Sequence, residues 1–275
     1  MSEGGSGCAI MGKSGLAWEA DRLERIKSDF TTLTWALIPV AVVINIVVGH
    51  IVQDILKLPI YLDSVGTILV AGLAGPLAGA MTGFLSDLLW GVIFSNPAIM
   101  PFAITAFCIG LVAGLWAHLG WFKKELPLVL GIVLVAGVGG LLILIQAVNS
   151  GPLGAGLALV LTVVVLILTA LRVFPALVVV GGVLTGLVAA VVSAPIAAFV
   201  FGGVTGSGTD FLVALFEATG SNILQAALGQ GLVSDPFDKF VSFCVVWILL
   251  RSLSRRYLVR FPRGSDLVQE QPIEA

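Results

Sequence analysis

Residues 59–94 read PIYLDSVGTILVAGLAGPLAGAMTGFLSDLLWGVIF, two hydrophobic runs separated at Gly75-Pro76. Proline has no amide hydrogen and a fixed φ, so Pro76 favours the first position of a new helix after a break. We therefore predict a partial helix over 62–75 and a second helix over 76–94. The first is too short to cross a bilayer upright.

Small residues recur at four-residue spacing in the same stretch, which lets helix backbones approach closely in lipid. The same spacing occurs in two later segments. The three groups are Ala71, Gly75, Gly79 and Gly83; Ala106, Gly110 and Gly114; and Gly182, Gly186, Ala190 and Ala194. We expect them to pack helices of this chain together, with docking of a partner subunit as the alternative.

The composition is that of an all-α membrane protein. Hydrophobic residues make up 58% of the 275 positions, charged residues only 11%, and the mean hydropathy is +1.10. A soluble domain carries about 25% charged residues. Long apolar runs favour helices over barrel strands, and we predict a polytopic helical bundle. The expected spans are 33–55, 62–75, 76–94, 101–119, 127–148, 155–174, 176–201 and 236–253.

Several function classes lack support in this sequence. The three cysteines are far apart and only two histidines are present, which argues against a metal cluster. No catalytic or nucleotide-binding motif is found, so we expect neither an enzyme nor a cofactor, and any ATP-driven role needs a separate ATPase. Basic patches interleaved with aromatic residues are missing, which argues against nucleic acid as a partner.

The distribution of charge predicts an orientation. With the N-terminus in the cytoplasm, all of the 14 Lys and Arg residues except Lys57 and Lys239 fall on the cytoplasmic side. The acidic residues that fall on the external side are Asp54, Asp63, Asp210, Glu217, Asp235 and Asp238. They indicate an acidic mouth suited to a polar or cationic small molecule, or simply charged, soluble external loops.

The predicted organisation has five parts. A cytoplasmic segment over 1–30 contains an amphipathic helix at 16–30. The bundle occupies 31–126 and 175–253, interrupted by a transmembrane hairpin at 127–174. A basic cytoplasmic tail occupies 254–275. Within the second half, residues 202–235 form a long external segment, which we interpret as a lid-like element because such loops are often functional. Thr209 is expected to cap its helix and Gly220 to end it, before Asn222 and Gln225.

A polar stripe in the first span is a candidate ligand wall. Asn45, Gly49, His50, Gln53 and Asp54 share one helix face. Such a stripe is unfavourable against lipid, so it should face the bundle or water. The alternative is that these side chains form interhelical hydrogen bonds at the membrane edge.

Asp87 is the second candidate feature, because a carboxylate inside a membrane helix is costly and by default suggests function. Trp90 follows on the same face and offers an aromatic plate, and Asn96 lies in the next external turn. Structural pairing of Asp87 with a neighbouring helix is the alternative. Together with Asp63, Asn222 and Gln225, these residues complete the predicted substrate site.

Several stretches resemble the substrate-binding S components of energy-coupling factor (ECF) transporters. They are YLDSVGTILVAGLAGPLAGAMTGFLSDLLWGVIF, PFAITAFCIGLVAGLWAHLGWF, SAPIAAFVFGGVTGSGTDF, SDPFDKFVSF and the basic RFPRG, within about residues 33–122 and 176–264. The resemblance implies a six-helix subunit of the prokaryotic cell membrane, multi-pass, with both termini cytoplasmic. It implies capture of a vitamin-like nutrient near the outer face, in a pocket formed by 53–63, the start of 101–119 and 176–235. Its implied partners are a transmembrane coupling subunit and two cytoplasmic ATPases.

The chain departs from that family in two places. Eight spans are predicted where the family has six, and the surplus is the hairpin at 127–174. The family's alanine-rich AxxxA pattern is missing from 35–41, WALIPVA, where Pro39 could kink the helix. Two other functions stay open: a stand-alone carrier with Asp87 or His50 as proton-linked groups, and a membrane sensor or assembly subunit.

Overall fold

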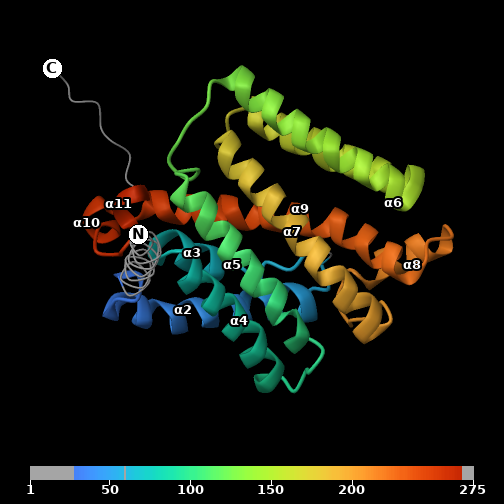
Figure 1. Cartoon of the computed structure of the whole chain (residues 1–275), viewed down its shortest axis with the longest axis horizontal. Helices are drawn as coiled ribbons and strands as arrows, with labels where there is room; N and C mark the ends of the chain where they lie inside the picture. Colours follow the sequence, from blue (N-terminus) through green and yellow to red (C-terminus); the bar gives the residue numbers. More distant parts are fainter. Residues whose placement is uncertain (1–27, 59, 268–275) are drawn as a thin grey trace, which may run out of the picture.

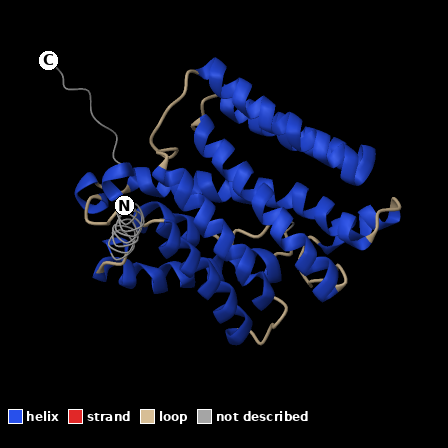
Figure 2. Cartoon of the chain, viewed as in Figure 1, coloured by secondary structure: helices blue, strands red, loops and turns tan. Residues whose placement is uncertain are grey.

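The computed structural model describes residues 28–58 and 60–267, apart from the side chain of Asp54. The described residues form helices and loops and contain no strand (Figures 1 and 2). Within residues 28–58 and 60–267, five helical segments are apolar and long enough to cross a membrane. The chain thus has the architecture of a helical membrane protein. Most of the amphipathic helix predicted over 16–30 lies outside the described residues.

The helices follow one another with short connections over most of the chain. α2 (Thr32–Gly49) continues into a π-helical turn (His50–Ile55), and a 3-10 turn (Met100–Phe102) leads into α5. The other helices are α3 (Val65–Ala74), α4 (Pro76–Ile93), α5 (Ala103–His118), α6 (Leu128–Ala170), α7 (Ala176–Phe201), α8 (Asp210–Ala218), α9 (Ile223–Ser252), α10 (Arg255–Leu258) and α11 (Gly264–Leu267).

The break between α3 and α4 lies where the sequence predicts it. Gly75 has φ 101° and ψ 171°, a backbone conformation that side chains with a Cβ rarely adopt. Pro76 then occupies the first turn of α4, where its missing amide hydrogen costs nothing. The predicted partial helix is α3, which is only 10 residues long.

The small-residue seams pack helices of this chain against one another. Gly110 of α5 lies against the backbone of Gly79 in α4, and Gly83 lies against the backbone of Ala106. Gly186 of α7 lies against the backbone of Pro236 in α9 in the same way. A side chain at these glycines would push the helix backbones apart, so the predicted intrachain packing is confirmed.

α6 reverses direction at Gly151, where φ is 64° and ψ is −154°. Its two halves lie side by side, because Gly139 of the first half packs against Thr162 of the second. Figure 1 shows this doubled helix along one edge of the molecule. The predicted spans 127–148 and 155–174 correspond to the two halves, joined through Gly151 and Pro152.

The boundary predicted between a lid-like segment and a last span at 236 is wrong. α9 runs without interruption through Pro236, because close packing against α7 supports the helix there. Asp235, Asp238 and Lys239 therefore lie along one continuous helix and are 4%, 0% and 2% exposed, so they are not part of a solvated external mouth. Gly220 (φ 95°) separates α8 from α9, as predicted.

The two ends of the bundle differ in charge. At one end, Arg263 pairs with Asp29 at 2.9 Å and Arg251 pairs with Glu125 at 3.0 Å. The basic residues of α10 follow α9 at this same end. The opposite end carries the loops 56–64, 94–99 and 202–209. Positive residues therefore concentrate at the end that contains the break at Gly75.

The seam between α4 and α5 provides a test of the packing. Gly110→Ala should lower the melting temperature, because overpacking costs about 1–3 kcal/mol. Gly137→Ala is the matched control: it lies within α6 with no neighbour near the added methyl group. There alanine should be neutral or stabilise the helix by up to about 1 kcal/mol. Tryptophan-fluorescence melts in detergent make the comparison, and equal melting temperatures would contradict the close packing.

Candidate ligand-binding site

A cavity of about 110 Å³ lies among α4, α5, α7 and α9, beneath the loops 56–64 and 202–209. A single water molecule needs roughly 10–15 Å³ of such space, so there is room for a small organic molecule. Polar side chains and apolar walls alternate around it: Gln53, Tyr61, Asp63, Asp87, Asn96, Thr105, Ser193, Gln230, Asp235 and Lys239, with Trp90, Ile99, Phe102, Ile109 and Val213 among the apolar residues.

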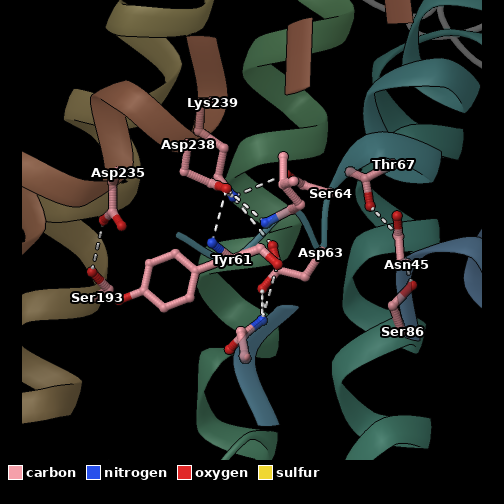
Figure 3. A network of polar contacts seen from close by, with 12 residues as sticks. Asn45, Tyr61, Asp63, Ser64, Thr67, Ser86, Ser193, Asp235, Asp238 and Lys239 are labelled. Carbon is pink, nitrogen blue, oxygen red and sulfur yellow. Dashed lines mark hydrogen bonds and ion pairs between the residues drawn. The ribbon is translucent and has the colours of Figure 1, made fainter. Parts of the chain in front are cut away.

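Lys239 is the centre of the polar network (Figure 3). Its ammonium group donates to Asp63 Oδ1 at 3.2 Å and to Ser64 Oγ at 2.9 Å, and it pairs with Asp238. These three acceptors match the three hydrogens of an ammonium group. Because Lys239 is fully engaged and 2% exposed, it has no donor left for an anionic ligand.

Asp238 and Gln53 position the loop 56–64. Asp238 Oδ1 accepts the backbone amides of Tyr61 at 3.0 Å and Leu62 at 2.6 Å. Gln53 donates to the Tyr61 carbonyl at 3.4 Å and to Asp63 Oδ2 at 3.2 Å. Leu62 has φ 52°, a conformation that costs about 1–3 kcal/mol and persists only where surrounding contacts enforce it. The network thus holds a strained loop over the cavity.

Tyr61 joins this loop to the second one. Its hydroxyl group bonds Thr209 Oγ1 at 3.0 Å and accepts from Gln230 Nε2 of α9 at 3.0 Å. Burial, and then the nearby Asp235 carboxylate, raise the pKa of Tyr61 above its ordinary value of 10.0, so the phenol stays neutral. Lys57 adds a bond to the Gly206 carbonyl at 3.1 Å.

The segment 202–209 is ordered by Asp210 at the start of α8. Asp210 accepts the backbone amides of Thr205 at 3.1 Å and Gly206 at 2.8 Å. Thr209 takes the N-cap position as predicted, but its side chain makes no capping bond and instead contacts Tyr61 and Ser207. The loop therefore closes against the site.

Three buried polar side chains line one part of the cavity: Asp87, Trp90 and Thr105, which are 7%, 1% and 7% exposed. Trp90 Nε1 and Thr105 Oγ1 are buried without a hydrogen-bond partner, and the Asp87 carboxylate accepts no hydrogen bond within the described ranges. Leaving such a group unsatisfied costs about 1–3 kcal/mol, and more for a charge. All three come from the neighbouring helices α4 and α5, so one wall of the cavity is polar and unpaired.

Asp235 lies on α9, on another side of the cavity. It accepts two long hydrogen bonds, from Ser193 and Ser234, both at 3.4 Å. Figure 3 shows it turned toward Ser193 of α7. Its carboxylate is therefore only weakly satisfied by the protein.

Half of the predicted site residues line this cavity: Gln53, Asp63, Asp87, Trp90 and Asn96. Asn45 instead ties three helices together. It donates to Thr67 Oγ1 at 2.8 Å and Ser86 Oγ at 3.0 Å, and accepts the Gly66 amide at 2.7 Å. For Asn45 the structure favours the interhelical alternative.

Three of the remaining predicted residues also lie outside the cavity lining. His50 stacks on Phe94 with ring centroids 4.1 Å apart and has an edge contact with Trp90, so it packs against a residue that lines the cavity. Asn222 and Gln225 form a reciprocal capping box at the start of α9, with bonds of 3.0 and 3.2 Å. The side chain of Asp54 is outside the described part of the chain.

Several lining residues were not among the predicted ones. Tyr61, Ser193, Gln230, Asp235 and Lys239 contribute to the site. A signal for α9 exists in the sequence: the spacing of the stripe Asn45, Gly49, His50, Gln53 and Asp54 is repeated by Gln230, Ser234, Asp235, Asp238 and Lys239. The second stripe marks one buried face of a helix that was divided at Pro236.

No family model, curated protein or solved structure matches this chain. The geometry of the cavity and its polar groups therefore carries the functional argument.

Removing Lys239 tests the network. Lys239→Met leaves Asp238 buried without a counter-charge, which should cost about 3–5 kcal/mol of unfolding free energy. Adding Asp238→Asn should restore part of the loss, because the uncompensated charge is gone. Arg251→Met, which breaks an exposed pair with Glu125, should cost at most about 1 kcal/mol. Thermal melts of the wild type, Lys239→Met, Asp238→Asn, the double variant and Arg251→Met provide the comparison. A double variant that loses the sum of both single losses would contradict the pairing.

Proposed function

We propose that this chain is the membrane-embedded substrate-binding subunit of an ECF-type importer and captures a small polar nutrient from outside the cell. The observation that carries the proposal is the cavity wall in which Trp90 Nε1 and Thr105 Oγ1 are buried without a partner beside Asp87, which accepts no hydrogen bond from the described residues. Native proteins rarely leave buried polar groups unsatisfied, so a ligand that completes their bonding is the simplest explanation.

The source of the cavity residues supports a six-helix core. Every described residue that lines the cavity comes from the two resembling regions, 33–122 and 176–264, and none comes from α6. The core would consist of α2, α3, α4, α5, α7 and α9. α6 would then be a transmembrane hairpin added at the side of the binding unit.

The charge distribution supports access from outside. The basic end of the bundle belongs in the cytoplasm by the positive-inside rule. At about 1.5 Å of rise per residue, Asp87 lies roughly 17 Å along α4 from Pro76, away from that end. The cavity lies under loops of the opposite end. Transport would then need the coupling subunit and two ATPases.

A proton-linked carrier is the second candidate, because a buried carboxylate without a partner also suits proton transfer. Asp87 could play that part, whereas His50 does not line the cavity. The two functions differ in their energy source.

Uptake by proteoliposomes distinguishes them. A thermal-shift screen of vitamins, nucleosides and their precursors against the purified chain first identifies a stabilising compound. Its uptake should require co-reconstituted coupling subunit, ATPases and ATP, and should survive a protonophore. Liposomes with the ATPases but without this chain serve as the control. Uptake by the chain alone that collapses with the protonophore would replace the proposal with the carrier.

A further inference from the structure

The charges that line the cavity are unequal. Among the described residues, four lining carboxylates, Asp63, Asp87, Asp210 and Asp235, accompany one lining ammonium group, Lys239. Asp63 is paired with Lys239, and its side chain is also 26% exposed. Asp210 is satisfied by the amides of the segment 202–209. Asp87 and Asp235 are therefore the lining carboxylates that have neither an ion pair within 4 Å nor a short hydrogen bond among the described residues.

Asp87 is the stronger of these two anchors. It is 7% exposed and accepts no hydrogen bond from any side chain or backbone amide in the described ranges. A buried charge without a partner costs several kcal/mol, which a positively charged ligand would offset. Lys239 has no hydrogen left to donate to the Asp87 carboxylate, because its three hydrogens are donated to Asp63, Ser64 and Asp238.

The surroundings of Asp87 suit a cation with an apolar body. Trp90 lies one turn further along α4, on the same face, and an indole ring attracts cations. Its Nε1–H and the Thr105 hydroxyl are unpaired, so a second, acceptor group of the ligand can be bound nearby. Ile99, Phe102 and Ile109 supply apolar surface for a flat skeleton.

We infer that the cavity binds a small organic cation, with its charged nitrogen paired to Asp87 and its apolar body against Phe102 and Ile109. This inference rests on the proposed function and specifies its substrate class. Anionic nutrients are disfavoured, since Lys239, the lining cation among the described residues, already donates to three protein acceptors. The Asp235 carboxylate is a weaker second acceptor, for a hydrogen-bond donor at the opposite end of the ligand.

Binding assays with charge-matched compounds test the inference. Each aromatic skeleton is supplied as cation, neutral molecule and anion, for example benzylammonium, benzyl alcohol and benzoate. Vitamins, nucleosides and amines sorted by charge complete the panel. Stabilisation of the full detergent-purified chain is measured by thermal shift, and affinities of the best compounds by calorimetry.

Asp87→Asn keeps the shape of the side chain and removes its charge. It should weaken binding of the cations by at least about tenfold. Asp29→Asn is the matched control, because Asp29 is also 7% exposed but pairs with Arg263 at the basic end. It should lower the melting temperature and leave affinity within about twofold, since distant sites act independently.

Three outcomes are distinguishable. Cations as the best ligands, with affinity lost in Asp87→Asn and kept in Asp29→Asn, support the inference. Neutral or anionic best ligands, or cations whose binding survives Asp87→Asn, overturn it and leave a nutrient-binding function standing. A panel in which no charge class binds overturns both the inference and the proposed function.

Discussion

A lysine ammonium group in the middle of a membrane-embedded bundle is stable only if protein groups replace its water, and this constraint organises the site. Lys239 meets it with Asp63, Ser64 and Asp238. Asp238 then has lone pairs left for the amides of Tyr61 and Leu62. One buried ion pair on α9 thereby dictates the path of the loop 56–64.

The loop 56–64 in turn connects the other elements around the cavity. Tyr61 links it to Thr209 and to Gln230 of α9, while Gln53 supports it from the end of α2. The packing beneath is equally specific, because backbone contacts at Gly110 and Gly186 leave no space for longer side chains. Among the described residues, the result is a closely packed frame in which Trp90 and Thr105 keep buried groups without a protein partner, beside Asp87.

The elements of this fold that depend on local sequence could be predicted. The break at Gly75-Pro76 follows from backbone chemistry, and the apolar helices follow from hydropathy. Asp87 and Trp90 were found because a carboxylate in an apolar helix is conspicuous.

What could not be predicted depends on tertiary partners. Pro236, with charges on either side, suggests a boundary between an external segment and a span, whereas contacts with α7 and the loop 56–64 allow one continuous buried helix. The Asn45 side chain hydrogen-bonds Gly66 and Ser86, which are distant in sequence, so its structural role depends on the tertiary fold. Asn222 and Gln225 carry a capping-box pattern that the sequence does contain, and the hypothesis of a lid obscured it.

The most direct measurement is an experimental structure of the chain with the small molecule that stabilises it most. We expect ligand density in the cavity, with a ligand atom within about 3 Å of the Asp87 carboxylate. Density bound elsewhere, with Asp87 paired to a protein side chain, would contradict it.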